Sequence, residues 1–249
     1  MIIINLINSI LDYYIFVFIC MRLNKIKKPS KIFAAVLSLS GLLFILSSSV
    51  LASPTSNFTQ TINAGTLAVD IVDGSYASVG SPSVAMNAAT FSFSCQSSTG
   101  TLGTATQQIY VVNPDAADNG WVVSIAASGP TAFWDGAAAD FDFNDPTTSG
   151  CGDGADTDSL IGQMTIDASG GTLATGGCSS CVTTNITKGS SNAFSEGPVN
   201  SITVLTGAAG SDDIGDWTLQ GVSLSQTIPA EQPAASDYDI NMTLSVVST

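Results

Sequence analysis

An unbroken alternation of apolar and polar side chains runs from Tyr238 to Val246, and it constrains the fold more than any other feature. Every second side chain in this run is apolar, so an extended strand presents all of them on one face. No segment of a dozen residues after residue 52 shows a sustained helical period of apolar residues. We therefore expect strands throughout residues 53–249.

Short apolar runs separated by turn residues indicate the fold class. Asn113-Pro114-Asp115 and Asn144-Asp145-Pro146 are typical of the turns between them. Many short strands in a chain of this length predict an all-β fold, a single antiparallel Ig-like β-sandwich. Residues 135–191, rich in Gly, Ser, Thr and Asp, are expected to form an insertion in this sandwich. The expected strands are Thr66–Val72, Thr90–Ser94, Gln107–Asn113, Trp121–Ala126, Gln163–Asp167, Ser201–Thr206, Trp217–Thr227 and Tyr238–Val247.

Residues 21–52 have the composition of an export signal rather than of a folded segment. Five basic side chains between Arg22 and Lys31 precede an apolar core over Ile32–Leu46, and Val50-Leu51-Ala52 supplies a small-residue cleavage signal. We expect cleavage after Ala52 and a secreted, extracellular protein. Residues 1–20 form an apolar prefix, which is either a start-site artefact, with translation beginning at Met21, or a short membrane segment.

The chain beyond the expected cleavage site is strongly acidic. Of the six Lys and Arg residues only Lys188 lies beyond residue 52, and of the twenty Asp and Glu residues only Asp12 lies before it. The remaining 197 residues (249 less 52) carry 19 acidic and one basic side chain, a formal charge of −18. Such a surface repels phosphates and anionic lipid headgroups and favours divalent cations, so nucleic acid is excluded as a partner.

Histidine is absent from the whole sequence. Its absence removes the commonest general base, the Ser–His and Cys–His pairs and the usual zinc ligand. A hydrolase that acts on wall glycan with carboxylates alone is an alternative, and it would need two buried carboxylates facing each other in a cleft. We expect a protein that is not an enzyme.

Four cysteines lie beyond the expected signal, an even number that is typical of disulfides in an oxidising compartment. Four cysteines allow three pairings, and the sequence does not choose among them. Cys178-Ser-Ser-Cys181 has the spacing of a redox motif but lies in a glycine-rich loop rather than at a helix start, which favours a structural disulfide. The cysteines expected in disulfides are Cys95, Cys151, Cys178 and Cys181.

Acidic residues are densest at two places in the insertion. Residues 140–145 place oxygen ligands two positions apart, and three further Asp residues follow among residues 153–158. Calcium takes about six to eight oxygen ligands from flexible loops, although the glycine position and closing Glu of an EF-hand are missing here. A solvated acidic loop is the alternative interpretation. The candidate calcium ligands are Asp140, Asp142, Asn144, Asp153, Asp156 and Asp158.

The tryptophans are candidates for stacking on a glycan. Trp121 begins an alternating run and Trp217 also stands at a strand start, so packing in the core is the default expectation for both. Trp134 lies at the mouth of the insertion beside Asp135-Gly136 and is expected to be the most exposed of the three.

Two segments resemble the WxL-domain surface proteins of bacteria. Ile109–Asp115 followed by Asn119-Gly120-Trp121-Val-Val-Ser-Ile resembles their first Trp-containing motif, where a strand and a turn lead into Gly-Trp-x-Leu. Residues 201–219, which include Trp217-Thr218-Leu219, look like the start of that domain's C-terminal half.

Val222–Pro229 and Tyr238–Val246 are similar to the rest of that half, in which the final motif is Tyr-x-x-x-Leu-Thr-Trp-x-Leu. Val123, Leu244 and Val246 depart from the family residues Leu, Trp and Leu. The resemblance implies a β-rich, secreted protein attached non-covalently to the cell wall, with peptidoglycan as the ligand. With the resemblance included, the candidate ligand-binding residues are Trp121, Trp134, Trp217 and Tyr238.

A second resemblance covers only Asn57–Asp70. Asn-Phe-Thr-Gln-Thr-Ile-Asn-Ala-Gly-Thr-Leu-Ala-Val-Asp is similar to the segment after the signal peptide in camelysin/TasA-like matrix proteins, which are β-sandwich subunits of extracellular fibres. A strand near this end could pair with the sheet edge of a neighbour. The expected function is therefore non-covalent binding to the cell wall or another surface polymer, with a self-assembling fibre subunit as the alternative.

Overall fold

The computed structural model describes residues 59–249 apart from 62, 64, 115–118, 148 and 213. The expected apolar prefix and signal peptide lie outside the described residues. One compact unit comprises Thr61–Thr249, and the fold is that of this unit. Its described residues form strands and no helix, which confirms the predicted all-β fold class.

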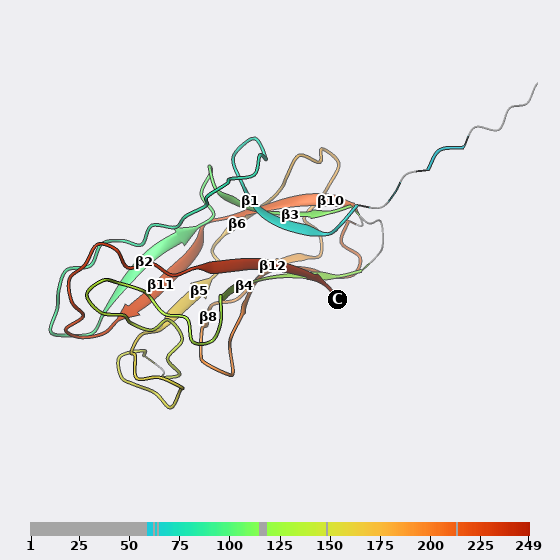
Figure 1. Cartoon of the computed structure of the whole chain (residues 1–249). Coiled ribbons are helices and arrows are strands. Elements are labelled where there is room, and N and C mark those ends of the chain that lie inside the picture. The colour runs from blue at the N-terminus through green and yellow to red at the C-terminus, as the bar shows by residue number, and fades with distance from the viewer. Residues whose placement is uncertain (1–58, 62, 64, 115–118, 148, 213) are drawn as a thin grey trace, which may run out of the picture. The chain divides into compact units, whose positions relative to one another are not determined.

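Twelve strands form within the described residues (Figure 1). They are β1 (Ala68–Val72), β2 (Gln96–Leu102), β3 (Gln108–Asn113), β4 (Trp121–Ala127), β5 (Met164–Asp167), β6 (Thr172–Thr175), β7 (Ile186–Lys188), β8 (Asn192–Ala193), β9 (Ile202–Gly207), β10 (Gly215–Gln220), β11 (Val222–Ile228) and β12 (Met242–Ser248). They build three four-stranded sheets with the orders β1-β3-β10-β6, β2-β11-β5-β8 and β12-β4-β9-β7. All pairs of strands are antiparallel.

The first two sheets continue into each other because three pairs of consecutive strands pass from one to the other. β2 leads into β3, β5 into β6 and β10 into β11, so the order β3-β10-β6 in the first sheet matches the order β2-β11-β5 in the second. Glycines allow the bend at this junction: Gly103 and Gly221 have φ of +83° and +74°. The amide of Gly221 donates to the carbonyl of Gly103 at 2.7 Å. A side chain at Gly103 would meet the Leu219 carbonyl oxygen at 2.8 Å.

The third sheet packs on this bent pair and closes the sandwich around one core. Trp121 on β4 and Trp217 on β10 meet there, with ring centroids 5.5 Å apart and 1% and 0% of each side chain exposed. The core prediction for both residues is confirmed. Burying a large apolar side chain stabilises the fold by roughly 1.5–3 kcal/mol. Nine further apolar residues of this core are 0% exposed: Ile109, Val111, Val123, Ile166, Phe194, Val204, Leu205, Leu219 and Val222.

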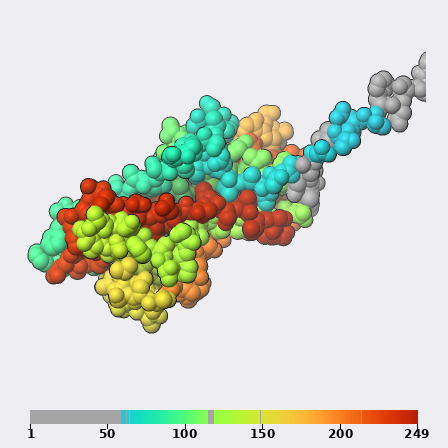
Figure 2. All heavy atoms as spheres, viewed as in Figure 1, coloured from blue at the N-terminus to red at the C-terminus, as the bar shows by residue number. Residues whose placement is uncertain are grey.

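The alternation from Tyr238 to Val246 is confirmed as a half-buried face, although β12 begins only at Met242. Before it, Asp239 pairs with Asp135 through two backbone hydrogen bonds of 2.9 and 3.0 Å. This contact carries the segment away from β4 and toward residues 128–163, the β4–β5 loop. In Figure 2 the C-terminal segment (red) lies open to solvent along the visible face, and part of the loop (yellow) projects beside it.

The strand expected at Thr90–Ser94 is wrong. Phe91 and Phe93 alternate there as in a strand, but they are 48% and 78% exposed and pack on each other in a T-shaped pair. The strand of this region is β2, whose Ser, Thr and Gly residues carry almost no apolar signal and which pairs with β11 along seven residues. The strand expected over Trp217–Thr227 is divided in two at Gly221.

The insertion is narrower than the expected residues 135–191. Strands β5, β6 and β7 lie inside this range and pair with β11, β10 and β9, so they belong to the sheets. The longest part without named strands is the β4–β5 loop. An isolated bridge from Asp135 to Asp239 ties it to the segment before β12, and another from Asn144 to Gln163 lies within the loop.

Candidate metal centre and aromatic wall

Three aspartates meet inside the β4–β5 loop, and we refer to Asp142, Asp145 and Asp156 as the carboxylate cluster. One carboxylate oxygen of each lies within 4.8 Å of those of the other two. The backbone brings the first two together because their amides donate to the carbonyls of Ile161 and Gly162, each at 3.0 Å. Residues 141–145 therefore run beside the chain that enters β5, and Asp156 reaches them from the turn between.

Each aspartate of the cluster has one buried oxygen without a hydrogen-bond partner. Asp142 and Asp145 are 1% and 0% exposed. Their Oδ1 atoms accept from the amides of Phe143 at 2.6 Å and Thr147 at 2.8 Å, whereas their Oδ2 atoms have no donor. Oδ1 of Asp156 is also without one. Buried polar atoms are almost always paired, so three such oxygens in one place require an explanation.

The charges of the cluster oppose one another. Burial raises the pKa of Asp142 from 3.8 to about 7, and the charges of Asp158 and Asp156 add to this. The pKa of Asp156 is also raised, first by burial and then by Asp158, Asp145 and Glu196. Among the described residues no basic side chain compensates, since the ammonium of Lys188, the only Lys or Arg beyond residue 52, donates to the Gly171 carbonyl at 2.6 Å.

The loop around the cluster is held from two sides. A disulfide joins Cys151 to Cys95, directly before β2, with 5.8 Å between their Cα atoms. Glu196 accepts from both the amide and the hydroxyl of Thr157, at 2.7 and 2.6 Å. Gly154 lies so close to the cluster that a Cβ there would be 2.7 Å from Oδ1 of Asp145. The three carboxylates are thus brought together by covalent and hydrogen-bonded supports.

Of the six predicted calcium ligands, Asp142 and Asp156 belong to the cluster. Asp140 accepts from the Gly136 amide at 3.2 Å, and the Asn144 amide group donates to the Pro130 carbonyl at 2.8 Å. Asp153 and Asp158 are exposed, and Oδ1 of Asp158 accepts from the Leu160 amide at 2.7 Å. These four lie outside the cluster.

Asp145 completes the group of three although it is not among the predicted ligands. The alternation of Asp and Asn over residues 140–144 favoured every second residue, whereas Asp145, outside that alternation, is the one that is 0% exposed. The polar doublet Asn144-Asp145 ahead of a proline was the available signal.

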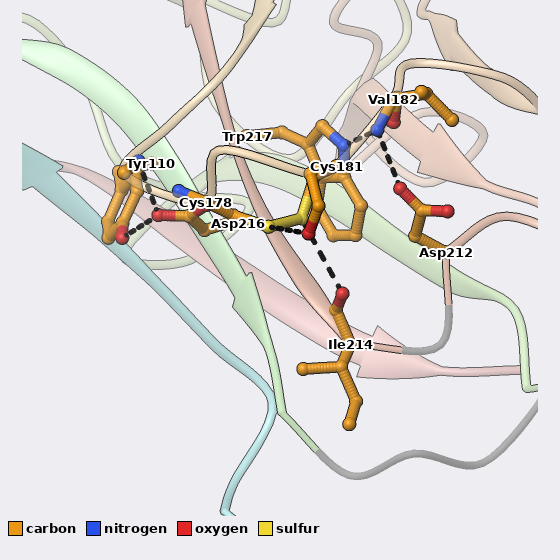
Figure 3. Close-up of a disulfide and its surroundings, with 10 residues drawn as sticks. Tyr110, Cys178, Cys181, Val182, Asp212, Ile214, Asp216 and Trp217 are labelled. Carbon is orange, nitrogen blue, oxygen red and sulfur yellow. Dashed lines mark hydrogen bonds between the residues drawn. A yellow bond between two sulfur atoms is a disulfide. The ribbon is translucent and has the colours of Figure 1, made fainter.

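The second group of potential ligands, Cys178, Cys181 and Asp216, is of a different kind. The two cysteines form a disulfide, as expected, so they offer no thiolate to a metal. Asp216 accepts from the Tyr110 hydroxyl and, at 2.8 Å each, from the amides of Gly177 and Cys178 (Figure 3). Burial and the adjacent Asp216 raise the pKa of Tyr110 above its ordinary value. This carboxylate is fully engaged in holding the loop.

Next to the carboxylate cluster, Trp134, Phe141 and Tyr238 form what we term the aromatic wall. Trp134 stacks on Phe141 with ring centroids 5.7 Å apart, and Phe141 contacts Tyr238 edge-on at 5.1 Å. The indole Nε1 of Trp134 donates to Gln226 at 2.9 Å. The Tyr238 hydroxyl donates to the Pro233 carbonyl at 2.7 Å and accepts from Gln232 at 2.9 Å. Both Trp134 and Tyr238 are half-buried.

Two cavities lie against this wall, with volumes of about 360 and 440 Å³, and Trp134 and Tyr238 line both. The larger one, which we call the groove, is also lined by Phe141 and by the polar side chains of Asn87, Gln96, Ser98 and Gln232. Trp121 and Trp217 line neither cavity, because both are buried in the core. Asp142 and Asp145 face each other but also line neither, so the cleft required by a carboxylate-only hydrolase is not found at these cavities.

In the part of the chain that the structure describes, no helix has the length and apolar character needed to cross a membrane. The two disulfides, Cys95–Cys151 and Cys178–Cys181, are compatible with an extracellular protein. No protein-family model, curated protein or solved structure matches this chain.

Proposed function

We propose that this is a secreted bacterial surface protein that binds the cell wall, through peptidoglycan or another surface glycan, without a covalent link. The observation that carries the proposal is the groove beside the aromatic wall. Its volume of about 440 Å³ lies in the range of small-molecule and sugar sites, roughly 300–1,000 Å³. Aromatic faces next to amide and hydroxyl groups are the chemistry that packs on a sugar ring and bonds its hydroxyls.

Charge narrows the class of polymer. The −18 of the chain beyond residue 52 repels polyanions, so a neutral or zwitterionic glycan is the better partner. Gln96 and Gln232, both half-buried, line the groove with uncharged side chains, so no charge has to be desolvated when a sugar binds.

The resemblance to WxL-domain proteins supports a role at the wall, but its tryptophans do not supply the contact. Trp121 and Trp217 pair in the core at 5.5 Å, so they serve the fold. Trp134 and Tyr238 are the two predicted ligand-binding residues that reach a cavity. We therefore assign contact with the polymer to these two.

Sedimentation with peptidoglycan sacculi tests the proposal. The purified, oxidised protein is expected in the pellet, and Trp134→Ala is expected to weaken binding by about tenfold because one aromatic face is lost. Phe133→Ala is the matched control, since Phe133 is the adjacent aromatic, is 37% exposed and lines neither cavity. Wild-type protein that stays in the supernatant, or equal losses for both variants, would overturn the assignment.

A fibre subunit is the second candidate, and one observation favours it. β12 is seven residues long, lies at the edge of its sheet and pairs only with β4 among the described strands. An open edge of this length can add a strand from another copy. Fibres in electron micrographs, together with no sedimentation on sacculi, would replace wall binding by this function.

A further inference from the structure

We propose that Asp142, Asp145 and Asp156 bind a calcium ion, which fastens the β4–β5 loop beside the aromatic wall. The ion site does not depend on the proposed polymer binding, and its test uses no polymer. Three steps lead to it: the unpaired oxygens require a positive partner, their chemistry selects calcium, and two hydrogen bonds connect the site to Trp134.

Among the described residues, no hydrogen-bond donor reaches the unpaired oxygens. The amides of Phe143 and Thr147 donate to the Oδ1 atoms of Asp142 and Asp145 instead. With exposures of 1% and 0%, the two side chains are closed to bulk water. One carboxylate oxygen from each of the three aspartates lies within 4.8 Å of the other two, a spacing at which a single cation can be shared.

The donor set selects a hard cation. All the unpaired atoms are carboxylate oxygens, the sequence has no histidine, and the four cysteines beyond the expected signal are joined in disulfides. Zinc and copper prefer nitrogen and sulfur, whereas calcium and magnesium prefer oxygen. Because the ligands come from an irregular loop rather than from a rigid octahedral frame, calcium is favoured over magnesium.

The cluster is coupled to the aromatic wall through the backbone of Asp142. Its carbonyl oxygen accepts from Nε2 of Gln226 at 2.9 Å, and Oε1 of the same amide accepts from Trp134 at 2.9 Å. The preceding residue, Phe141, stacks on Trp134. An ion that holds Asp142 therefore also holds the wall, so indole fluorescence is expected to change with calcium.

Calorimetric titration of the metal-stripped protein tests the site. Extracellular calcium modules bind with Kd of about 10⁻⁴–10⁻³ M, so a titration to about 10 mM covers the range. We expect one ion per chain and a rise in Tm of about 5–10 °C in calcium relative to EDTA. No heat and no shift in Tm would overturn the proposal, and an equal response to magnesium would overturn its choice of ion.

Asp145→Asn and Asp156→Asn locate the site, with Asp153→Asn as the matched control. Asp153 is exposed, lies in the same loop and is not in the cluster. Loss of one carboxylate is expected to weaken calcium binding at least about tenfold. The substitutions also remove repulsion, so both variants are expected to be as stable as wild type in EDTA, which separates lost binding from lost folding. An equal loss in Asp153→Asn would refute the assignment.

Discussion

Two buried acidic sites lie beside disulfide-bonded loops, and they treat their carboxylates in opposite ways. At the Cys178–Cys181 loop, Asp216 receives hydrogen bonds from a tyrosine hydroxyl and two amides. At the Cys95–Cys151 loop, Asp142, Asp145 and Asp156 each keep an oxygen without a donor. The first site is complete within the chain, whereas the second is completed by an ion under our proposal.

The difference comes from which backbone amides reach the carboxylate. A side chain at Gly176 would meet Asp216 Oδ2 at 2.6 Å, so the glycine is what lets residues 177 and 178 approach with their amides. In the cluster, the amides beside Asp142 and Asp145 serve one oxygen each, and three negative charges share one space. Acidic residues near a disulfide therefore indicate a metal site only when their donors are missing.

The largest expected effect is that of Asp216→Ala. It leaves a tyrosine hydroxyl and two amides without their acceptor, and we expect the free energy of unfolding to fall by about 3–5 kcal/mol. Urea denaturation in EDTA and in calcium measures this loss, which should be the same in both. If calcium restores the stability of Asp216→Ala, Asp216 takes part in ion binding, and the contrast between the two acidic sites is wrong.

The two disulfides should differ in their contribution to stability. Cys95 and Cys151 are 56 residues apart and Cys178 and Cys181 are 3 apart. Loop closure predicts about 4 kcal/mol for the first and roughly 1.5 kcal/mol for the second when both cysteines are replaced by serine. Calcium affinity, measured by the same calorimetry, should fall only for the first pair. A fall in calcium affinity on loss of Cys178–Cys181 would contradict separate roles for the two disulfides.

A dependence of stability on pH in EDTA is expected to be smaller than the effect of losing Asp216 or the Cys95–Cys151 disulfide. In the unfolded chain Asp142 ionises near 3.8, and in the folded chain near 7, beside Asp145, Asp156 and Asp158. Between these values the folded state holds the additional proton, so stability falls as pH rises from about 4 to about 7. We expect the free energy of unfolding to fall by about 2 kcal/mol over this range. The full pKa shift corresponds to roughly 4 kcal/mol, and relaxation of the loop reduces this value.

The matched variant for this experiment is Asp142→Asn, whose stability should not fall over this pH range. With calcium, the stability of the wild type should instead rise with pH, because the ion binds the ionised carboxylate. Urea midpoints across the pH range, with and without calcium, provide the measurement. If the stability of the wild type in EDTA does not change with pH, folding does not raise the pKa of Asp142.

How much of this could be predicted from sequence depended on whether a residue's partners were near in the chain. The strands β4 and β12 could be predicted because their apolar residues alternate along the sequence itself. β2 was not, because a strand of Ser, Thr and Gly is defined by its neighbour β11 rather than by its own side chains.

The carboxylate cluster was partly predicted for the same reason. Density of Asp in the insertion identified Asp142 and Asp156, but their selection over Asp153 and Asp158 depends on burial that the loop acquires only when folded. The donors to Asp216 are 38, 39 and 106 residues away in the chain, so no local sequence pattern predicts them. The aromatic wall likewise joins Trp134 to Tyr238 across Phe141.

The continuation of β10 into β11, from the first sheet into the second, also bears on how the molecule would carry a mechanical load. Gly215–Ile228 is a single stretch of backbone, interrupted only by the bend at Gly221, that contains both Trp217 of the core and Gln226 beneath the aromatic wall. Under the proposed function, a pull on a polymer held at Trp134 would reach the core by two routes: covalently through residues 128–133 to β4, and through one hydrogen bond to Gln226. Gly215–Ile228 would therefore share that load with β4.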